Sequence, residues 1–252
     1  MRSTACLLVH GFGGTPFEVL PVGEALTDAG YPVSAPTLPG HDTTVEDWRR
    51  TGWKDWVEHA AAEYERLSAE YEKVFLLGLS MGGSICLALA QRFKPAGVAT
   101  IASPVFLYRF LPPEATDWRL VATPLLKKLR PVWPATPKTP ESRAIAPWRG
   151  YEEAVSLEAL HSFMDGLRHV RQNLGRITAP LLAIHSPLDR HVPLGNLWEI
   201  ARRVGSPWRK AVLLPIEETV TKHHLLTTHR ETRGKVAGLC VEFVRELSED
   251  QI

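Results

Sequence analysis

The chain has 252 residues, with 29 Lys and Arg against 28 Asp and Glu and a formal net charge of +1. A chain of this length buries about three quarters of its unfolded surface, so one α/β domain accounts for it without a second full domain. The balanced charge indicates neither a nucleic-acid-binding face nor an acidic tail, and we expect a small neutral substrate.

The sequence also limits where the protein works. No apolar run approaches the ~20 residues of a membrane span, so we expect no stable membrane insertion. The apolar run at the N-terminus is too short for a signal peptide. Cys6, Cys86 and Cys240 each lie in an apolar run without paired spacing, which predicts buried free thiols and neither a disulfide framework nor a metal knuckle. These features predict a cytoplasmic protein.

The N-terminal segment reads as a strand, a turn and a helix. Residues 5–10 form a continuous apolar run, which is typical of a strand buried on both faces, and the glycine-rich turn 11–14 follows. Thr15, Pro16 and Glu18 then match a capping box, with the hydroxyl and the carboxylate satisfying backbone donors at the start of a helix. We therefore expect Glu18 to cap this helix.

Strand and helix continue to alternate over the next part of the chain. Short strands are predicted at 31–35, 73–78 and 97–101, and helices at 53–71 and 81–92. Such alternation implies a mostly parallel central sheet, of about six to seven strands, flanked by helices on both faces.

The alternation stops after residue 103. Residues 104–147 hold nine of the chain's 20 prolines, too many for regular parallel-sheet units, and a helix is predicted at 152–174. We interpret 104–176 as an inserted cap on a core domain made of 1–103 and 177–252. In the second part of the core we expect strands at 180–185 and 209–215 and helices at 194–204 and 236–247.

A strand-to-helix turn carries the candidate nucleophile. Gly78-Leu79-Ser80-Met81-Gly82 matches G-x-S-x-G between an apolar strand and a helix, the context that makes this pattern specific. The turn would present the Ser80 hydroxyl at the carboxyl edge of the sheet, where open α/β folds bind ligands. The alternative is a turn of small residues that merely joins the two elements.

A serine hydroxyl needs a base within hydrogen-bond reach and an acid that orients the base. Asp189 lies on a turn directly after a predicted strand, which favours it as the acid over a solvated turn aspartate. The loop after strand 209–215 carries both His223 and His224; position favours His224, and the choice stays open. His229 lies further on and is interpreted as a surface or capping group.

The reaction also needs two backbone N–H donors for a negatively charged oxygen. Met81, at the start of a helix, is one candidate, and Phe12 in the glycine-rich turn is the other. The competing interpretation of that turn, a phosphate-binding loop, is disfavoured because G-x-G-x-x-G is absent and no Walker lysine follows. No H-E-x-x-H or comparable set is present either, so no metal site is predicted.

These residues resemble the α/β-hydrolase superfamily, and within it the small carboxylesterases and monoacylglycerol lipases with a compact cap. The resemblance spans nearly the whole chain and includes the Asp189 turn and the histidine segment. Three further motifs carry it: LVHGFGGTP at 8–16, PTLPGH at 36–41 and GLSMGG at 78–83. The histidine segment departs from the pattern, because Lys222 and His223 stand where relatives often have a glycine before the histidine.

The resemblance implies a catalytic triad of Ser80, Asp189 and His224, with Phe12 and Met81 as the oxyanion donors. It also implies hydrolysis of short- to medium-chain acyl esters or monoacylglycerols through an acyl-enzyme, without a cofactor. Alternatives are a thioesterase or acyltransferase of the same fold, and a non-catalytic ligand-binding homologue.

The expected partner is a small-molecule ester, with no nucleic acid, and the protein is expected to be a monomer or a weak homodimer. Apolar residues of the turn, the nucleophile motif and the cap are candidates to line the acyl pocket. For each cap residue, packing within the cap is the competing interpretation. The candidates for substrate binding are Phe12, Met81, Val105, Phe106 and Leu160.

Overall fold

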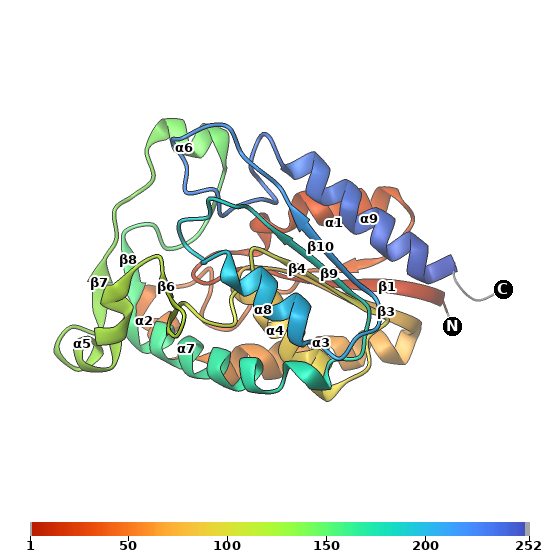
Figure 1. Cartoon of the computed structure of the whole chain (residues 1–252), viewed down its shortest axis with the longest axis horizontal. Coiled ribbons are helices and arrows are strands. Elements are labelled where there is room, and N and C mark those ends of the chain that lie inside the picture. The colour runs from red at the N-terminus through yellow and green to blue at the C-terminus, as the bar shows by residue number, and fades with distance from the viewer. Residues whose placement is uncertain (1, 250–252) are drawn as a thin grey trace.

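The computed structural model describes residues 2–249 and contains a central sheet of six strands, all parallel. The strand order is β10-β9-β4-β3-β1-β2, which agrees with the predicted α/β class and strand number (Figure 1). The strands are β1 (Arg2–Val9), β2 (Val33–Ser34), β3 (Tyr71–Leu79), β4 (Gly97–Ile101), β9 (Leu181–His185) and β10 (Arg209–Leu213).

Burial of the strands follows their place in the sheet. The central strands β4 and β9 are buried along their whole length, because helices cover both faces, and their sequences are accordingly continuous apolar runs. The edge strand β10 is mostly exposed. The short strand β2 closes the other edge.

Helices cover the two faces of the sheet and create two separate cores. One face carries α1 (Leu20–Asp28) and α9 (Arg233–Glu249), and the other carries α3 (Trp53–Glu70), α4 (Met81–Arg92) and α8 (Gly195–Arg203) (Figure 1). The bounds of α4 and β4 coincide with the predicted ones. The remaining helical segments outside the cap are η1 (Pro16–Glu18) and α2 (Val45–Arg49).

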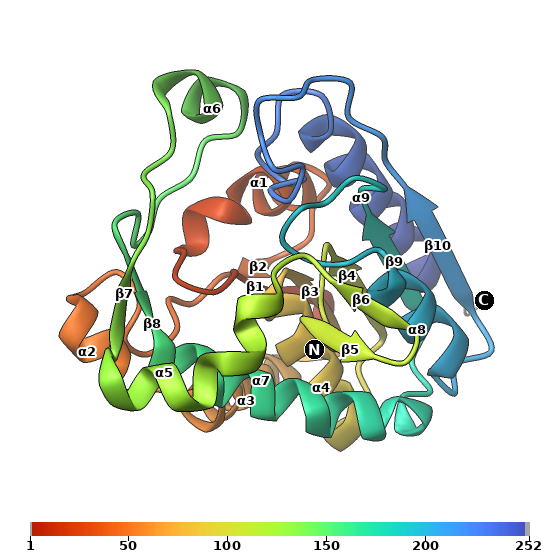
Figure 2. The same cartoon turned by 60° about the vertical axis from the view of Figure 1, so that its left-hand side comes forward.

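The segment treated as a cap contains short elements that pair among themselves (Figure 2). Two small antiparallel sheets, β5 with β6 and β7 with β8, lie beside three helices and two 3₁₀ turns. We retain the term cap for 104–176 as a proposal. The elements are β5 (Tyr108–Phe110), β6 (Pro113–Ala115), η2 (Trp118–Ala122), α5 (Thr123–Leu129), β7 (Val132–Pro134), α6 (Pro140–Ile145), β8 (Ala154–Ser156), α7 (Leu157–Gln172) and η3 (Leu174–Arg176).

The helix predicted at 152–174 is shorter than expected. It begins at Leu157, because 154–156 form strand β8, which pairs with 132–134. Helix α7 buries Phe163 and Leu167 in the same core as α3 and α4. The helix therefore joins the cap to the core through apolar packing.

The predicted capping box at Thr15 and Glu18 is wrong. The Thr15 side chain makes no cap hydrogen bond at the start of η1. The Glu18 carboxylate instead accepts from the backbone N–H of Gly11, at 2.6 Å, and from the indole N–H of Trp148. Glu18 therefore accepts from Gly11 and Trp148 and does not cap the helix start, because the glycine-rich turn folds over its side chain.

Candidate active site

Ser80 lies on the sharp turn between β3 and α4. Its backbone is in a strained conformation, with φ 54° and ψ −121°, which only close surrounding packing can hold. The packing is visible at the neighbouring glycines: a Cβ at Gly78 would collide with the backbone of α4, and one at Gly82 with the Val9 carbonyl of β1. The turn therefore requires glycine at both positions and holds the Ser80 side chain at the carboxyl edge of the sheet.

Asp189 follows β9 and lies at the same edge of the sheet. Its Oδ1 accepts the backbone N–H groups of His191 and Val192 at 2.7 and 2.9 Å, which fixes the carboxylate and leaves Oδ2 facing His224. Burial acts to raise the pKa of Asp189, but the nearby His224, through its charge and its hydrogen bond, holds that pKa below its ordinary value. The carboxylate is therefore ionised at neutral pH.

His224 lies between Asp189 and Ser80. Its Nδ1 is 2.8 Å from Asp189 Oδ2, and its Nε2 is 2.9 Å from Ser80 Oγ. Because a carboxylate only accepts, we assign the proton to Nδ1, which leaves Nε2 free to accept the serine proton. His223, the other candidate, has φ 55°, and its Nε2 lies 2.6 Å from the Glu218 carbonyl. The structure thus brings His224, and not His223, to Ser80.

The glycine-rich turn after β1 is fixed through the Gly11 carbonyl. His10 Nδ1 lies 2.9 Å from this oxygen, and the Gly14 N–H donates to it. Burial lowers the pKa of His10 to about 3, so the ring is neutral, and its Nε2 accepts from the Leu38 N–H. Since a trans peptide is planar, fixing the Gly11 carbonyl also fixes the Phe12 N–H, which points the opposite way.

Two backbone donors are available beside the serine. Met81 is the first residue of α4, and such residues have no partner inside the helix. Over residues 2–249, neither the Phe12 N–H nor the Met81 N–H donates a hydrogen bond to another part of the chain. The turn after β1 lies directly beside Ser80, since a Cβ at Gly11 would lie 3.4 Å from Ser80 Cβ.

The residues expected to bind substrate are in different surroundings. The Phe12 ring is partly buried and packs against Trp48 and Phe163, with ring centroids 4.8 and 5.7 Å away, while the Met81 side chain is fully buried. Leu160 is partly buried on α7 and packs against the same core. Their contact with an acyl chain stays a prediction.

The cap residues Val105 and Phe106 are both buried. Their backbone N–H groups donate to Asn196 Oδ1 on α8, at 2.7 and 2.9 Å, which anchors the start of the cap. The Phe106 ring lies near the guanidinium groups of Arg109 and Arg171, at 4.5 and 5.3 Å from its centroid. This packing accounts for the burial of Phe106, and its role in substrate binding also stays a prediction.

Comparison with known proteins places the chain among hydrolases. Residues 2–215 match the sequence model of the family described as serine aminopeptidase, S33. A thermostable monoacylglycerol lipase of Bacillus sp. (strain H-257) is 33% identical over 209 residues, which cover 82% of this chain and 79% of the relative. The chain belongs to this family of serine hydrolases. A carboxylesterase of Bacillus subtilis (strain 168) is 27% identical over 189 residues, or 75% of this hydrolase and 73% of the relative.

Solved structures agree with the α/β-hydrolase fold. A structure from a study of the metagenome-derived lipolytic enzymes LipS and LipT has a TM-score of 0.83 at 24% identity and covers 97% of this chain and 94% of its own. A monoacylglycerol lipase of Paleococcus ferrophilus has a TM-score of 0.76 at 19% identity, with coverage of 98% and 97%. Within residues 2–249, no helix is both long and apolar enough to cross a bilayer.

Sequence reasoning missed Glu218, which organises the loop that carries His224. Its carboxylate accepts from the Thr221 hydroxyl, from the backbone N–H groups of Val220 and Thr221, and from His229 Nε2 at 3.0 Å. His229 is fully buried, so its interpretation as a surface group is wrong. The alternative of a capping group agrees with its Nδ1, which accepts the backbone N–H of Glu231 just before α9. No local pattern marks this cluster, because its members become neighbours only when the loop folds.

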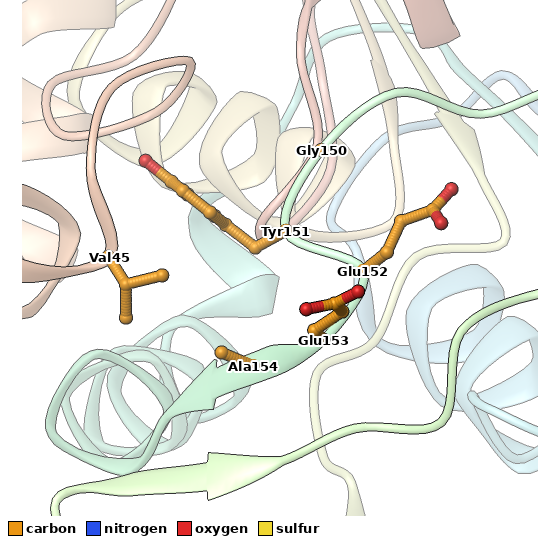
Figure 3. Close-up of a pocket in the computed structure, with 6 residues that line it drawn as sticks. All are labelled: Val45, Gly150, Tyr151, Glu152, Glu153 and Ala154. Atoms are coloured by element: carbon orange, nitrogen blue, oxygen red, sulfur yellow. The ribbon is translucent and has the colours of Figure 1, made fainter.

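An open pocket of about 320 Å³ lies beside the cap, and none of Ser80, Asp189 and His224 lines it (Figure 3). Val45 of α2 and residues 150–154 of the cap line it. The Tyr151 side chain reaches across to the loop before α2, where its hydroxyl donates to the Gly40 carbonyl at 2.7 Å. This hydrogen bond attaches the cap to the core at a further point.

Proposed function

We propose that this protein is a serine carboxylesterase that hydrolyses short- to medium-chain acyl esters or monoacylglycerols through an acyl-enzyme. The observation that carries the proposal is the continuous hydrogen-bonded series from Asp189 Oδ2 through His224 to Ser80 Oγ, with separations of 2.8 and 2.9 Å. Relatives named monoacylglycerol lipase and carboxylesterase support the choice of substrate class.

In the first half of the proposed reaction, Ser80 Oγ attacks the ester carbonyl while His224 Nε2 takes its proton. Asp189 holds the imidazole in the required tautomer and stabilises the imidazolium. The N–H groups of Phe12 and Met81 donate to the oxygen that becomes negative. The C–O bond of the ester then breaks, the leaving alcohol receives the proton from His224, and the acyl group stays on Ser80.

In the second half, His224 takes a proton from water as the water attacks the acyl-enzyme. The same two N–H groups stabilise the second tetrahedral intermediate. Its collapse releases the carboxylic acid and returns the proton to Ser80. All groups that these steps need belong to the chain itself, and the buried, neutral His10 keeps the Phe12 donor oriented throughout.

Ser80→Ala tests the proposal. We expect kcat on a p-nitrophenyl ester to fall by about 10⁶, because the nucleophile is lost while the donors remain. A fluorophosphonate probe should label the unmodified protein at Ser80 and should not label the variant. Ser68→Ala, which changes an exposed serine on α3, is the matched control and should keep full activity. Retained activity or labelling in Ser80→Ala would exclude Ser80 as the nucleophile.

The proposal includes the setting of the enzyme: a cytoplasmic protein, monomeric or weakly dimeric, that acts on a small-molecule ester. The three cysteines support a reducing compartment, since all are buried and free. The formal net charge of +1 supports a substrate other than nucleic acid. Light scattering coupled to size-exclusion chromatography measures the oligomeric state directly.

A further inference from the structure

Glu18 is a buried carboxylate that the proposed reaction does not use. The residue is 2% exposed, and its side chain fills the inside of the glycine-rich turn. A Cβ at Gly14 would lie 2.5 Å from the carboxylate, and one at Gly11 would lie 3.0 Å from its Oε2. The absence of side chains at both glycines therefore makes room for Glu18.

The carboxylate joins the turn to the cap. Oε2 accepts the Gly11 N–H at 2.6 Å, and Oε1 accepts the indole N–H of Trp148, a cap residue. The Gly11 N–H belongs to the peptide that directly precedes the one carrying the Phe12 N–H. Glu18 thus restrains the turn one peptide away from the expected oxyanion donor.

The cap contacts the same turn through its backbone. Gly150 forms an isolated antiparallel bridge with Gly14, and the Tyr151 N–H donates to the Gly13 carbonyl at 2.9 Å. Trp148 lies two residues before this bridge. The cap segment around 148–151 and the Glu18 carboxylate therefore hold the turn from two sides.

The ionisation of Glu18 is finely balanced. Burial is the largest effect and raises the pKa of Glu18. The hydrogen bonds from Gly11 and Trp148 and the charges of His224 and Lys138 lower it, and the resulting pKa is about 7. Lys138 belongs to the cap, with its Nζ 4.7 Å from the centre of the Trp148 ring, and His224 belongs to the loop after β10. These are the charged groups that act on Glu18 from the elements around it.

We propose that ionised Glu18 is a positioning residue, which holds the glycine-rich turn in the conformation that directs the Phe12 N–H toward the reacting oxygen. Through Trp148, the same carboxylate links this conformation of the turn to the docked cap. The inference rests on the proposed function. A carboxylate accepts both N–H donors at full strength, whereas the protonated acid accepts more weakly and presents an O–H. The turn is held best when the proton is absent.

Glu18→Gln is the first test. A glutamine has one acceptor oxygen and places an NH₂ group opposite one of the two N–H donors, so the turn loses a restraint. We expect kcat on a p-nitrophenyl ester to fall about 10- to 100-fold with KM nearly unchanged, because an oxyanion donor acts mainly in the transition state. The rate of fluorophosphonate labelling at Ser80 should fall with kcat.

The pH profile separates positioning from a purely structural role. In the unmodified enzyme, activity should fall as the pH drops through about 7 and Glu18 gains its proton. Glu18→Gln should move this acidic limb to lower pH, because the glutamine does not titrate and only the need for an unprotonated His224 Nε2 still limits activity there. Trp148→Phe keeps the Gly11 contact but removes a hydrogen bond that favours the charged carboxylate, so it should move the limb to higher pH. Loss of packing alone does not produce shifts of opposite sign.

Glu24→Gln, an exposed glutamate on α1, and Trp198→Phe, an exposed tryptophan on α8, are the matched controls and should reproduce the unmodified profile. A folded Glu18→Gln with unchanged kcat, or an unmoved limb in Trp148→Phe, would overturn the inference. Should Glu18→Gln fail to fold, the direction of the Trp148→Phe shift decides. Labelling of the unmodified protein is measured first: its absence refutes the proposed function, whereas labelling at equal rates in the unmodified enzyme and Glu18→Gln refutes the inference alone.

Discussion

Three carboxylates near His224 have different ionisation behaviour, although all three are largely removed from water. Burial acts to raise the pKa of each. At Glu218 the hydrogen bonds from Thr221 and His229 outweigh burial and lower the pKa to about 2. At Asp189 the neighbouring His224 also outweighs burial and lowers the pKa. Glu18 has fewer hydrogen-bond donors, so burial has the larger effect and its pKa is raised. The number of donors around a buried carboxylate thus decides its charge.

Glu218→Gln should weaken both activity and stability. The amide cannot accept at its nitrogen, so at least one buried donor of the loop loses its partner, at a cost of about 1–3 kcal/mol. We expect the melting temperature at pH 7 to fall by several degrees, and kcat to fall because His224 is held less firmly. Calorimetry and steady-state kinetics measure the two effects.

The stability difference should depend on pH with a defined sign. Because the folded-state pKa of Glu218 is lowered from 4.5 to about 2, its contribution is fully present above pH 4.5 and is lost as the pH falls towards 2. The deficit of Glu218→Gln should therefore be largest near neutral pH and shrink below pH 4. Glu217→Gln, the exposed neighbour, is the control. A deficit that is constant from pH 7 to pH 3 would contradict an ionised role for Glu218.

At the scale of elements, the sequence predicts best where one element is followed directly by the next around a buried turn. The bounds of α4 and β4 were predicted from their apolar runs, because nearly every side chain of both elements is buried. The start of α7 was not, since the pairing of β8 with β7 links residues far apart in the chain. Long-range pairing leaves no local pattern.

Two glycine-to-alanine changes in different helices should have opposite effects. Gly82 in the first turn of α4 faces the Val9 carbonyl, so Gly82→Ala should push α4 away from β1 and abolish labelling of Ser80. Gly238 lies inside α9, and a Cβ added to it would meet open space, so Gly238→Ala should stabilise the protein by about 0.5–1 kcal/mol without changing kcat. Urea denaturation measures the stability of each variant. Fluorophosphonate labelling and steady-state kinetics measure the state of Ser80 and kcat. Tolerance of Gly82→Ala would contradict the close packing at the Ser80 turn.

At the scale of the whole molecule, the sheet separates two hydrophobic cores that different helices form. Helices α1 and α9 cover one face, whereas α3 and α4 cover the other face and pack against α7, the long helix of the cap (Figures 1 and 2). Ser80 lies at the start of α4 in this second core and beside the glycine-rich turn, which the cap contacts through Gly150 and Tyr151. An acyl chain bound at Ser80 should therefore contact both core and cap.

A series of p-nitrophenyl esters of increasing chain length should map this contact. Burial of each methylene contributes about 0.8 kcal/mol, so kcat/KM should rise about fourfold per methylene until the pocket ends. Leu160→Ala, on the partly buried face of α7, should flatten the rise, whereas Leu111→Ala, a leucine of the cap that is 88% exposed, should not. A flat profile in the unmodified enzyme would contradict an enclosed acyl pocket.

The sequence by itself determined the α/β class, the strand-turn-helix around Ser80, and the short list of partners for this serine, because these follow from local apolar periodicity and from turns that tolerate only glycine. Tertiary structure decided which histidine reaches Ser80, and it assembled the hydrogen-bond donors around Glu18 and Glu218. The physical reason is range: a hydrogen bond such as that between Trp148 and Glu18 joins residues 130 positions apart and leaves no trace in either local sequence. The charge of a buried carboxylate depends on donors that gather around it only in the folded chain.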